Sequence, residues 1–186
     1  MMTKALIVYG TRYGAAASTS EELAKVFRQE GLEVRVVNAK EEKVNNIADC
    51  DLVVVGSGIL IERWTSEPEK FLKKFQKELA RKKVALFVCC GSASQALNEE
   101  KPEIATRARR KYLEEKAVKY SLQPVALGFF GGVYNYNKAP WYAKKAMEAD
   151  RPKIEAGYKE TQPGIYDTRD WNAIRSWAKE LALKAK

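Results

Sequence analysis

Short apolar runs alternate along this chain with segments that have the spacing of amphipathic helices, and this alternation constrains the fold most. Four runs have the pattern of strands buried on both faces: KALIVY (4–9), DLVVVGS (51–57), VALFVCC (84–90) and QPVALGFF (123–130). A fifth run, EVRVVN (33–38), alternates apolar and polar residues like an outer strand. Helices are predicted at about 18–30, from 66, at about 102–119 and from near 170. The pattern indicates an α/β fold with a parallel sheet covered on both faces.

The number and spacing of the strands predict their order in the sheet. Five strands joined by right-handed crossovers fit the doubly wound order 2-1-3-4-5 better than a six-stranded dinucleotide fold. In that order a crevice opens between the first and third strands at their carboxyl ends, and the loops 10–16 and 58–66 should line it. Residues 131–169 are long for a loop and hold many aromatics and a predicted helix at 140–149, so we treat them as an insertion between the last strand and the last helix.

The amino-acid composition excludes several kinds of catalytic and metal site. The chain has 186 residues, of which 46% are hydrophobic, and we expect residues 1–186 to form a single domain. It has three cysteines and no histidine, which excludes Ser-His and Cys-His nucleophiles and every histidine-dependent metal site. Cys89 and Cys90 end an apolar run, so we expect them in the core. We predict no catalytic side chain and no metal ligands, and any redox chemistry must come from a bound cofactor.

Charge and hydropathy bear on partners and location. No run approaches the roughly 20 apolar residues that span a bilayer, and the N-terminus lacks a signal-peptide pattern, so we expect a cytoplasmic protein. The net charge of +9 favours anionic partners. Nucleic acid is a poor fit, because the aromatic residues are not interleaved with the basic cluster at 107–111.

The loop after the first strand, GTRYGAA (10–16), has the properties of a phosphate site. It leads from a strand into a helix, whose first turn offers free N–H groups and a partial positive charge. Gly10 and Gly14 let the backbone turn, Thr11 adds a hydroxyl, and Arg12 adds a cation. Neither G-x-x-x-x-G-K-[ST] nor G-x-G-x-x-G is present. The alternative is a tight turn that binds nothing.

Three loops together resemble a known family. T-x-x-G (11–14) after ALIVYG is similar to the flavodoxin phosphate loop T-x-T-G-x-T, while VVVGSGIL (53–60) and FVCCGSAS (87–94) resemble that family's second and third flavin-contacting loops. The closer resemblance is to a flavodoxin-domain subfamily that includes the menaquinone-dependent protoporphyrinogen oxidase of bacteria. It rests on a TRDG-like first loop, the aromatic-basic stretch 134–142 and a TDW-like entry to the last helix at 168–171.

The resemblance implies a flavodoxin-like fold and a noncovalently bound FMN. The residues implied to hold the phosphate are Thr11, Arg12, Tyr13, Gly14, Ala15 and Ala16. Those implied near the isoalloxazine are Ser57, Gly58, Ile59 and Trp64, and those on its pyrimidine side are Gly91, Ser92 and Ala93.

The sequence departs from the family pattern at two points. Ala16 stands where the family has threonine, and Ser18 is the residue that could replace the lost hydroxyl. The third loop lacks the aromatic residue that stacks on the flavin, so Trp64, Tyr13 or an insertion aromatic would have to cover the ring.

Three functions remain open at this stage. The first is FMN-mediated electron transfer to a redox partner protein. The second is an enzyme similar to protoporphyrinogen oxidase that acts on an anionic small molecule such as a porphyrinogen and uses a quinone acceptor. The third is a flavin-free binding module, which Ala16 and the missing aromatic would favour. A peripheral membrane contact is a further partner surface to consider, and the sequence does not predict the oligomeric state.

Overall fold

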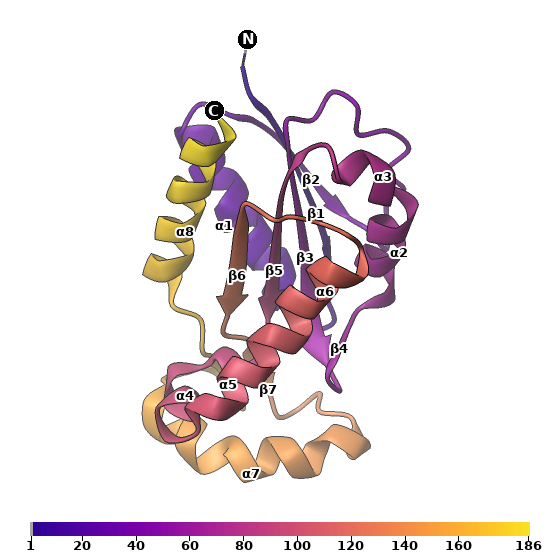
Figure 1. The fold of residues 1–186 in the computed structure, drawn as a ribbon. Coiled ribbons are helices and arrows are strands. Elements are labelled where there is room, and N and C mark those ends of the chain that lie inside the picture. The colour runs from indigo at the N-terminus through magenta and orange to yellow at the C-terminus, as the bar shows by residue number, and fades with distance from the viewer. Residues whose placement is uncertain (1) are drawn as a thin grey trace.

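The computed structural model describes residues 2–186 and has a parallel sheet at its centre (Figure 1). Five strands lie side by side in this order: β2 (Glu33–Asn38), β1 (Lys4–Gly10), β3 (Leu52–Leu60), β5 (Lys83–Cys89) and β6 (Ala126–Phe130). All four pairings between them are parallel. A short strand that the sequence did not predict, β4 (Arg63–Trp64), pairs antiparallel with the end of β3. The predicted order 2-1-3-4-5 of the parallel strands is confirmed.

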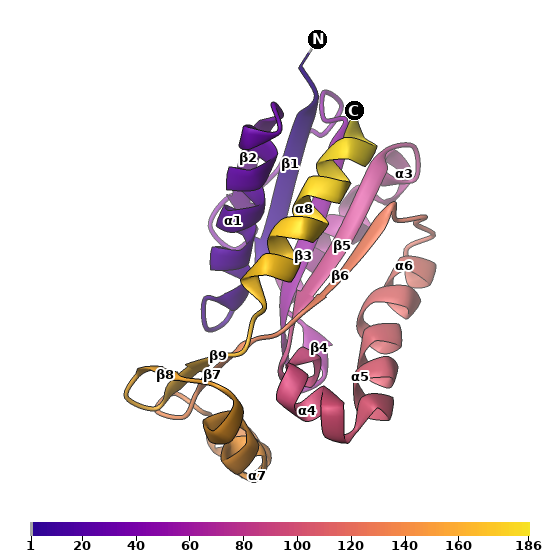
Figure 2. The same ribbon diagram turned by 90° about the vertical axis from the view of Figure 1, so that its left-hand side faces the viewer.

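Helices cover both faces of the sheet, as Figures 1 and 2 show. One face carries α1 (Ala15–Gln29) and α8 (Trp171–Ala185). The other carries α2 (Ser66–Lys74), α3 (Gln76–Leu79) and a long helix made of α5 (Pro102–Arg109), a π-helical turn η2 (Arg110–Glu114) and α6 (Glu115–Lys119). Because side chains alternate along a strand, Ala5 and Ile7 pack toward α1 while Leu6 and Val8 pack toward α2. Both faces are therefore apolar, which explains the uninterrupted strand runs.

Local signals fix where two of these helices begin. Gly14 has φ of +90° and precedes the first residue of α1, so the helix starts at Ala15, three residues before the predicted start. A left-handed backbone conformation of this kind suits glycine. At α8, the Asp170 carboxylate accepts a hydrogen bond from the Ala173 N–H at 2.9 Å, which caps the helix near the predicted start at 170.

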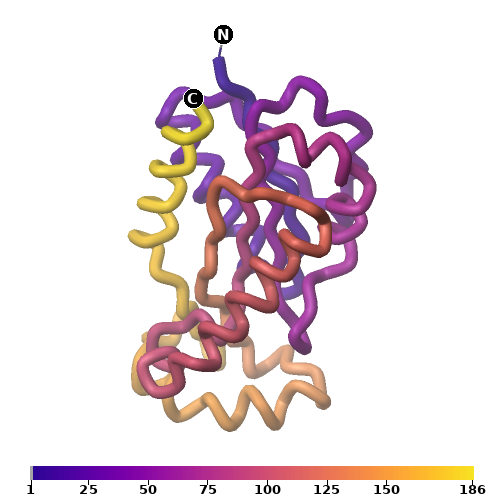
Figure 3. The backbone as a smooth tube through the Cα atoms, viewed as in Figure 1, coloured from indigo at the N-terminus to yellow at the C-terminus, as the bar shows by residue number. Residues whose placement is uncertain are grey.

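The insertion forms a small layer of its own at the carboxyl end of the sheet. It contains β7 (Val133–Asn135), α7 (Trp141–Gly157), β8 (Glu160–Gln162) and β9 (Ile165–Asp167), with the three strands in the antiparallel order β7-β9-β8. Tyr134, Ile154 and Tyr166 form its apolar core. The sequence predicted a helix only at 140–149 and no second sheet. Figures 2 and 3 show α7 lying across the end of the parallel sheet, opposite the two termini.

None of the helices in residues 2–186 combines the length and the apolar character needed to cross a membrane.

Candidate functional site

A cleft of about 550 Å³ opens at the carboxyl ends of β1, β3 and β5, and residues of α7 line its opposite wall. It lies at the switch point of the sheet, where ligands of such folds bind. The residues predicted to contact a cofactor that line this cleft are Thr11, Arg12, Tyr13, Ala15, Gly58, Ile59, Gly91 and Ser92. The other predicted residues, which lie next to the lining rather than in it, are Gly14, Ala16, Ser57, Trp64 and Ala93.

A hydrogen bond within the first loop fixes the shape of its turn. The Gly14 N–H donates to Thr11 Oγ1 at 3.0 Å, which closes the turn. The first turn of α1 then points its free N–H groups toward the loop, as any helix start does. Ala16 is fully buried in the core between α1 and the sheet. Because the side chain at 16 packs into the core, a small apolar residue suits this position.

The Ser18 hydroxyl is hydrogen-bonded within α1 and to the segment before α8. Its Oγ donates to the Gly14 carbonyl oxygen at 3.1 Å and accepts a hydrogen bond from Arg169 Nη1 at 2.6 Å. The hydroxyl is thus engaged on the side of α1 that faces the segment before α8. The suggestion that Ser18 replaces the family's threonine stays a prediction, and Ser18 is not among the residues that line the cleft.

The second loop is a hairpin, and the side chain of Ser57 joins its two strands by hydrogen bonds. Ser57 Oγ donates to the Gly58 carbonyl oxygen at 2.8 Å and accepts from the Thr65 N–H at 2.9 Å. At the hairpin tip, Ile61 and Glu62 both have positive φ, which two-residue hairpin turns require but which is rare for a β-branched residue. Ile61 is 60% exposed and lines the cleft.

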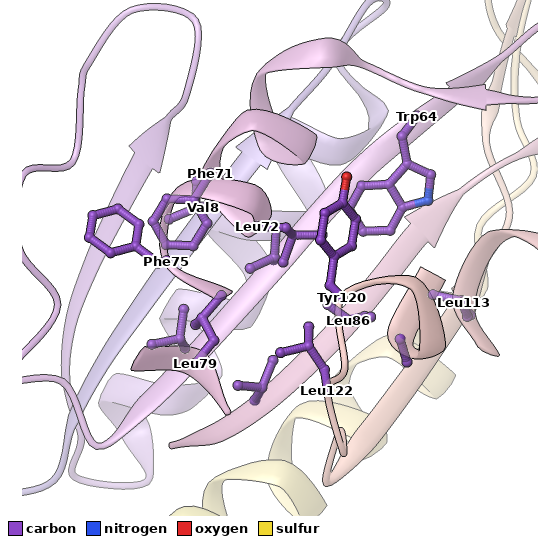
Figure 4. Close-up of a cluster of buried hydrophobic side chains, with 14 of the residues drawn as sticks. Val8, Trp64, Phe71, Leu72, Phe75, Leu79, Leu86, Leu113, Tyr120 and Leu122 are labelled. Atoms are coloured by element: carbon purple, nitrogen blue, oxygen red, sulfur yellow. The ribbon is translucent and has the colours of Figure 1, made fainter. Parts of the chain in front are cut away.

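Trp64 lies in the core and not in the cleft wall. Its side chain is only 6% exposed, and Nε1 donates to the Tyr112 carbonyl oxygen, within the π turn, at 2.9 Å. Figure 4 shows Trp64 beside the apolar cluster with Leu72 and Tyr120. The pairing of β4 with β3 places the Trp64 ring against the core. A strand of only two residues has no periodicity from which this orientation could be predicted.

The third loop forms a short 3₁₀ turn, η1 (Gly91–Ala93), directly after β5. A Cβ atom at Gly91 would lie 2.3 Å from the Tyr134 hydroxyl, so only glycine leaves room for that ring. Tyr134 comes from the insertion and lines the cleft beside this loop. Tyr134 thus places an aromatic ring where the third loop itself has none, while Ala93 packs against the core.

Two buried thiols lie at the floor of the cleft. Burial raises the pKa of Cys89 to about 11 and that of Cys90 to about 12, while Cys50 is half-buried elsewhere. We therefore expect Ellman's reagent at pH 8 to modify one thiol of the folded protein and all three after unfolding, because only a thiolate reacts. Rapid modification of three thiols in the folded protein would contradict this packing.

The wall opposite the loops was not predicted from the sequence. Its apolar residues come from a short helix after η1, α4 (Gln95–Glu100), from α5 and from α7, and they are Leu97, Ile104, Ala143, Ala146 and Met147. Three charged residues interrupt it, namely Lys101, Asp150 and Lys153, and Tyr112 and Tyr142 add aromatic surface. Only the aromatic-basic composition of the insertion hinted at this wall, because its members lie on elements far apart in the chain.

Asp150 is the one carboxylate on the α7 side of the cleft, and Tyr134 faces it. The Tyr134 hydroxyl lies 3.4 Å from Asp150 Oδ2. Burial raises the pKa of Asp150 above 3.8, although the Tyr134 hydrogen bond and the charges of Lys153 and Lys101 act in the opposite direction. Burial also raises the pKa of Tyr134, so its hydroxyl stays protonated.

Replacing Asp150 with asparagine is expected to stabilise the flavin-free protein at pH 7. A carboxyl whose pKa is higher in the folded state makes stability fall as the pH rises from 3.8 through that raised pKa. The variant should melt at a higher temperature at pH 7, by less than the roughly 2–4 °C that 1 kcal/mol produces in a chain of this size. The difference should vanish as the pH falls below 3.8, and thermal scans across this range measure it. A constant difference at all pH values would contradict the assignment.

The basic cluster predicted on the helix at 102–119 is mostly paired. Arg109 contacts Glu114, Arg110 Nε lies 3.5 Å from Glu115 Oε1, and Lys111 Nζ lies 2.6 Å from Glu62 Oε2. These pairs are exposed and contribute little to stability. They fit a solvated helix face better than a docking patch.

Comparison with known proteins places the fold and the site in context. A family model described as a flavodoxin domain matches residues 6–162. Protoporphyrinogen IX dehydrogenase [quinone] of Escherichia coli strain K12 is 24% identical over 179 residues, which cover 96% of this chain and 94% of that protein.

Solved structures show the same architecture at low sequence identity. A short-chain flavodoxin associated with a PDU bacterial microcompartment has a TM-score of 0.60 at 14% identity, with both chains fully covered. A flavodoxin from the domain Archaea has a TM-score of 0.56 at 15% identity, covering 98% of this chain and 99% of the other. A rubredoxin:oxygen oxidoreductase of Desulfovibrio gigas has a TM-score of 0.57 at 16% identity, and 98% of this chain spans only 36% of that protein. The sheet order, the cleft at its switch point and the match over residues 6–162 show that this chain belongs to the flavodoxin domain family.

Proposed function

We propose that the protein binds FMN in this cleft and transfers electrons through it. The observation that carries the proposal is the position of the cleft, which starts at the first turn of α1 and runs past the second and third loops. Its volume of about 550 Å³ lies in the range of small-molecule sites. The flavodoxin family membership supports a flavin as the occupant.

The residues present fit such a group. Thr11, Arg12 and the N–H groups that follow Gly14 would hold the phosphate. The backbones of Gly58, Ile59 and Gly91 would flank the ring. When bound, FMN supplies the one- and two-electron chemistry, so no side chain has to act as an acid or a base. The two features that favoured a flavin-free module have structural explanations, since Ala16 belongs to the core and Tyr134 provides an aromatic ring at the third loop.

A second function, oxidation of a small molecule, is favoured by the extent of the cleft. Beyond the three loops it continues between α5 and α7, where apolar side chains and two lysines line it. An apolar ring system with carboxylates suits such a wall. The related protoporphyrinogen IX dehydrogenase [quinone] supports a porphyrinogen as substrate and a quinone as acceptor. Trp141, which is 86% exposed next to Tyr142 and close to Lys144, supports a peripheral membrane contact where a lipid-dissolved quinone would enter.

Two assays distinguish the functions. The FMN-loaded protein is reduced chemically and then mixed with a quinone, and its absorbance reports reoxidation. Separately, protoporphyrinogen is supplied with the quinone and the coloured product is followed. Turnover of protoporphyrinogen supports the enzyme, whereas reversible reduction without such turnover supports an electron carrier. A protein whose bound FMN cannot be reduced would contradict both.

A further inference from the structure

A buried arginine stands directly behind the first turn of α1. The Arg169 side chain is only 6% exposed, although it carries a full positive charge. Its Nη1 donates to the Ala15 carbonyl oxygen at 2.8 Å and to Ser18 Oγ at 2.6 Å. Arg169 is separated from these residues by about 150 positions in sequence, so only the fold brings them together. It does not line the cleft, whereas Ala15 does.

The position of Arg169 is electrostatically unusual. A helix N-terminus carries a partial positive charge and disfavours a cation there. Asp167 compensates, because its carboxylate accepts two parallel hydrogen bonds, from Arg169 Nε at 2.8 Å and from Nη2 at 2.7 Å. The guanidinium also lies over the Trp171 ring, 4.3 Å from its centroid. A buried ion pair often contributes little to the free energy of unfolding, because both charges lose their hydration. Stability alone therefore does not explain why Arg169 lies here.

The whole segment 167–170 is anchored to the site. Thr168 Oγ1 donates to the Gly132 carbonyl oxygen at 2.9 Å and accepts from the Gly132 N–H at 3.1 Å, and Gly132 lines the cleft. Asp170 caps α8. Between these two anchors the Asp167 carboxylate holds the Arg169 guanidinium, which reaches the Ala15 carbonyl oxygen on α1. The segment therefore connects the insertion to the start of α1.

We infer that Arg169 is a positioning residue for the phosphate loop: it fixes the first turn of α1 from behind, so that the N–H groups after Gly14 stay aimed at a phosphate in front. The inference deepens the proposed function and rests on it. It also predicts which part of the ligand is affected. The affinity for the phosphate should depend on Arg169, and the affinity for the flavin ring should not.

The test compares FMN with riboflavin, which lacks the phosphate. The flavin-free full chain is titrated with each by fluorescence quenching. The double variant Asp167→Asn/Arg169→Gln removes both charges and so leaves no buried carboxylate without a partner. We expect it to bind FMN at least about tenfold more weakly and riboflavin with an affinity within about twofold of the parent protein. Arg169→Lys, which keeps a donor for the Ala15 carbonyl but loses the fork, should recover part of the FMN affinity.

Arg175→Gln is the matched control. Arg175 also joins the C-terminal helix to α1, through Glu22 at 2.5 Å, but on the exposed surface away from the cleft. It should leave FMN affinity within about twofold of the parent. The inference is overturned if the double variant keeps its FMN affinity, or if FMN and riboflavin weaken by the same factor, which would indicate a merely structural role.

Inorganic phosphate separates this inference from the proposed function. If the parent protein binds phosphate in an Arg169-dependent way but does not bind FMN, the proposed function fails and the positioning role stands. If it binds FMN and the double variant binds it equally well, the positioning role fails and the proposed function stands. A parent protein that binds neither probe overturns both.

Discussion

Replacing Gly14 with valine is expected to weaken FMN binding by at least about 100-fold while the protein still folds. Gly14 has φ of +90°, a conformation that a β-branched residue strongly disfavours. A Cβ atom there would meet nothing within 4 Å, so the change acts on the backbone and not on packing. Relaxing this residue to negative φ would break its hydrogen bond to Thr11 and turn the following N–H groups away from the phosphate. The measurement is an FMN titration followed by fluorescence.

Gly31 provides a matched control for this substitution. It ends α1 at the other side of the molecule, has φ of +84° and likewise has nothing within 4 Å of an added Cβ. Valine at either position should cost about 1–2 kcal/mol of stability, which is small beside the typical total of about 5–15 kcal/mol. Only the change at Gly14 should affect FMN. Equal FMN affinities of the two variants would mean that the phosphate is held elsewhere.

Replacing Gly131 with alanine is expected to have the largest effect on stability among the changes near the site. A Cβ atom at Gly131 would lie 2.3 Å from the backbone oxygen of Thr168. That oxygen cannot move without disturbing the hydrogen bonds that join Thr168 to Gly132. We expect a loss of about 2 kcal/mol and a melting temperature lower by about 4–8 °C. The insertion should also become sensitive to proteolysis at temperatures below the melting transition, because the segment before α8 holds the insertion against the rest of the domain.

The neighbouring Gly132 is the control for Gly131. A Cβ atom there would meet Cys90 backbone atoms only at 3.4–3.6 Å, which is an ordinary contact. Gly132→Ala should therefore melt within about 2 °C of the parent. If both substitutions destabilise equally, the close packing of Thr168 on Gly131 is not what holds the insertion in place.

The parallel sheet and its switch point could be predicted because they depend on local periodicity. A strand buried on both faces leaves a continuous apolar run, and four such strands, one alternating outer strand and the helices between them restrict the topology to few choices. The first loop could be predicted for the same reason, since Gly10–Gly14 directly follows the first strand. Residues of that loop line the cleft, as its place after the first strand predicts.

The rest depends on long-range contacts that leave no local pattern. The strands of the insertion have three residues each, and β8 is exposed throughout, so no alternation marks them. The Trp64 side chain packs into the core because β4 pairs antiparallel with β3. A strand of two residues is too short for a sequence pattern to predict this pairing. Arg169 carried no signal, because its partners on α1 lie at the other end of the chain.

The central claim is that the cleft holds FMN by its phosphate at residues 11–16. The most direct test is a titration of the flavin-free protein with FMN, followed by desalting and a visible absorption spectrum. The account predicts quenching that saturates at one FMN per chain and a flavin spectrum that remains after desalting. A protein that quenches no FMN fluorescence and emerges colourless would contradict it.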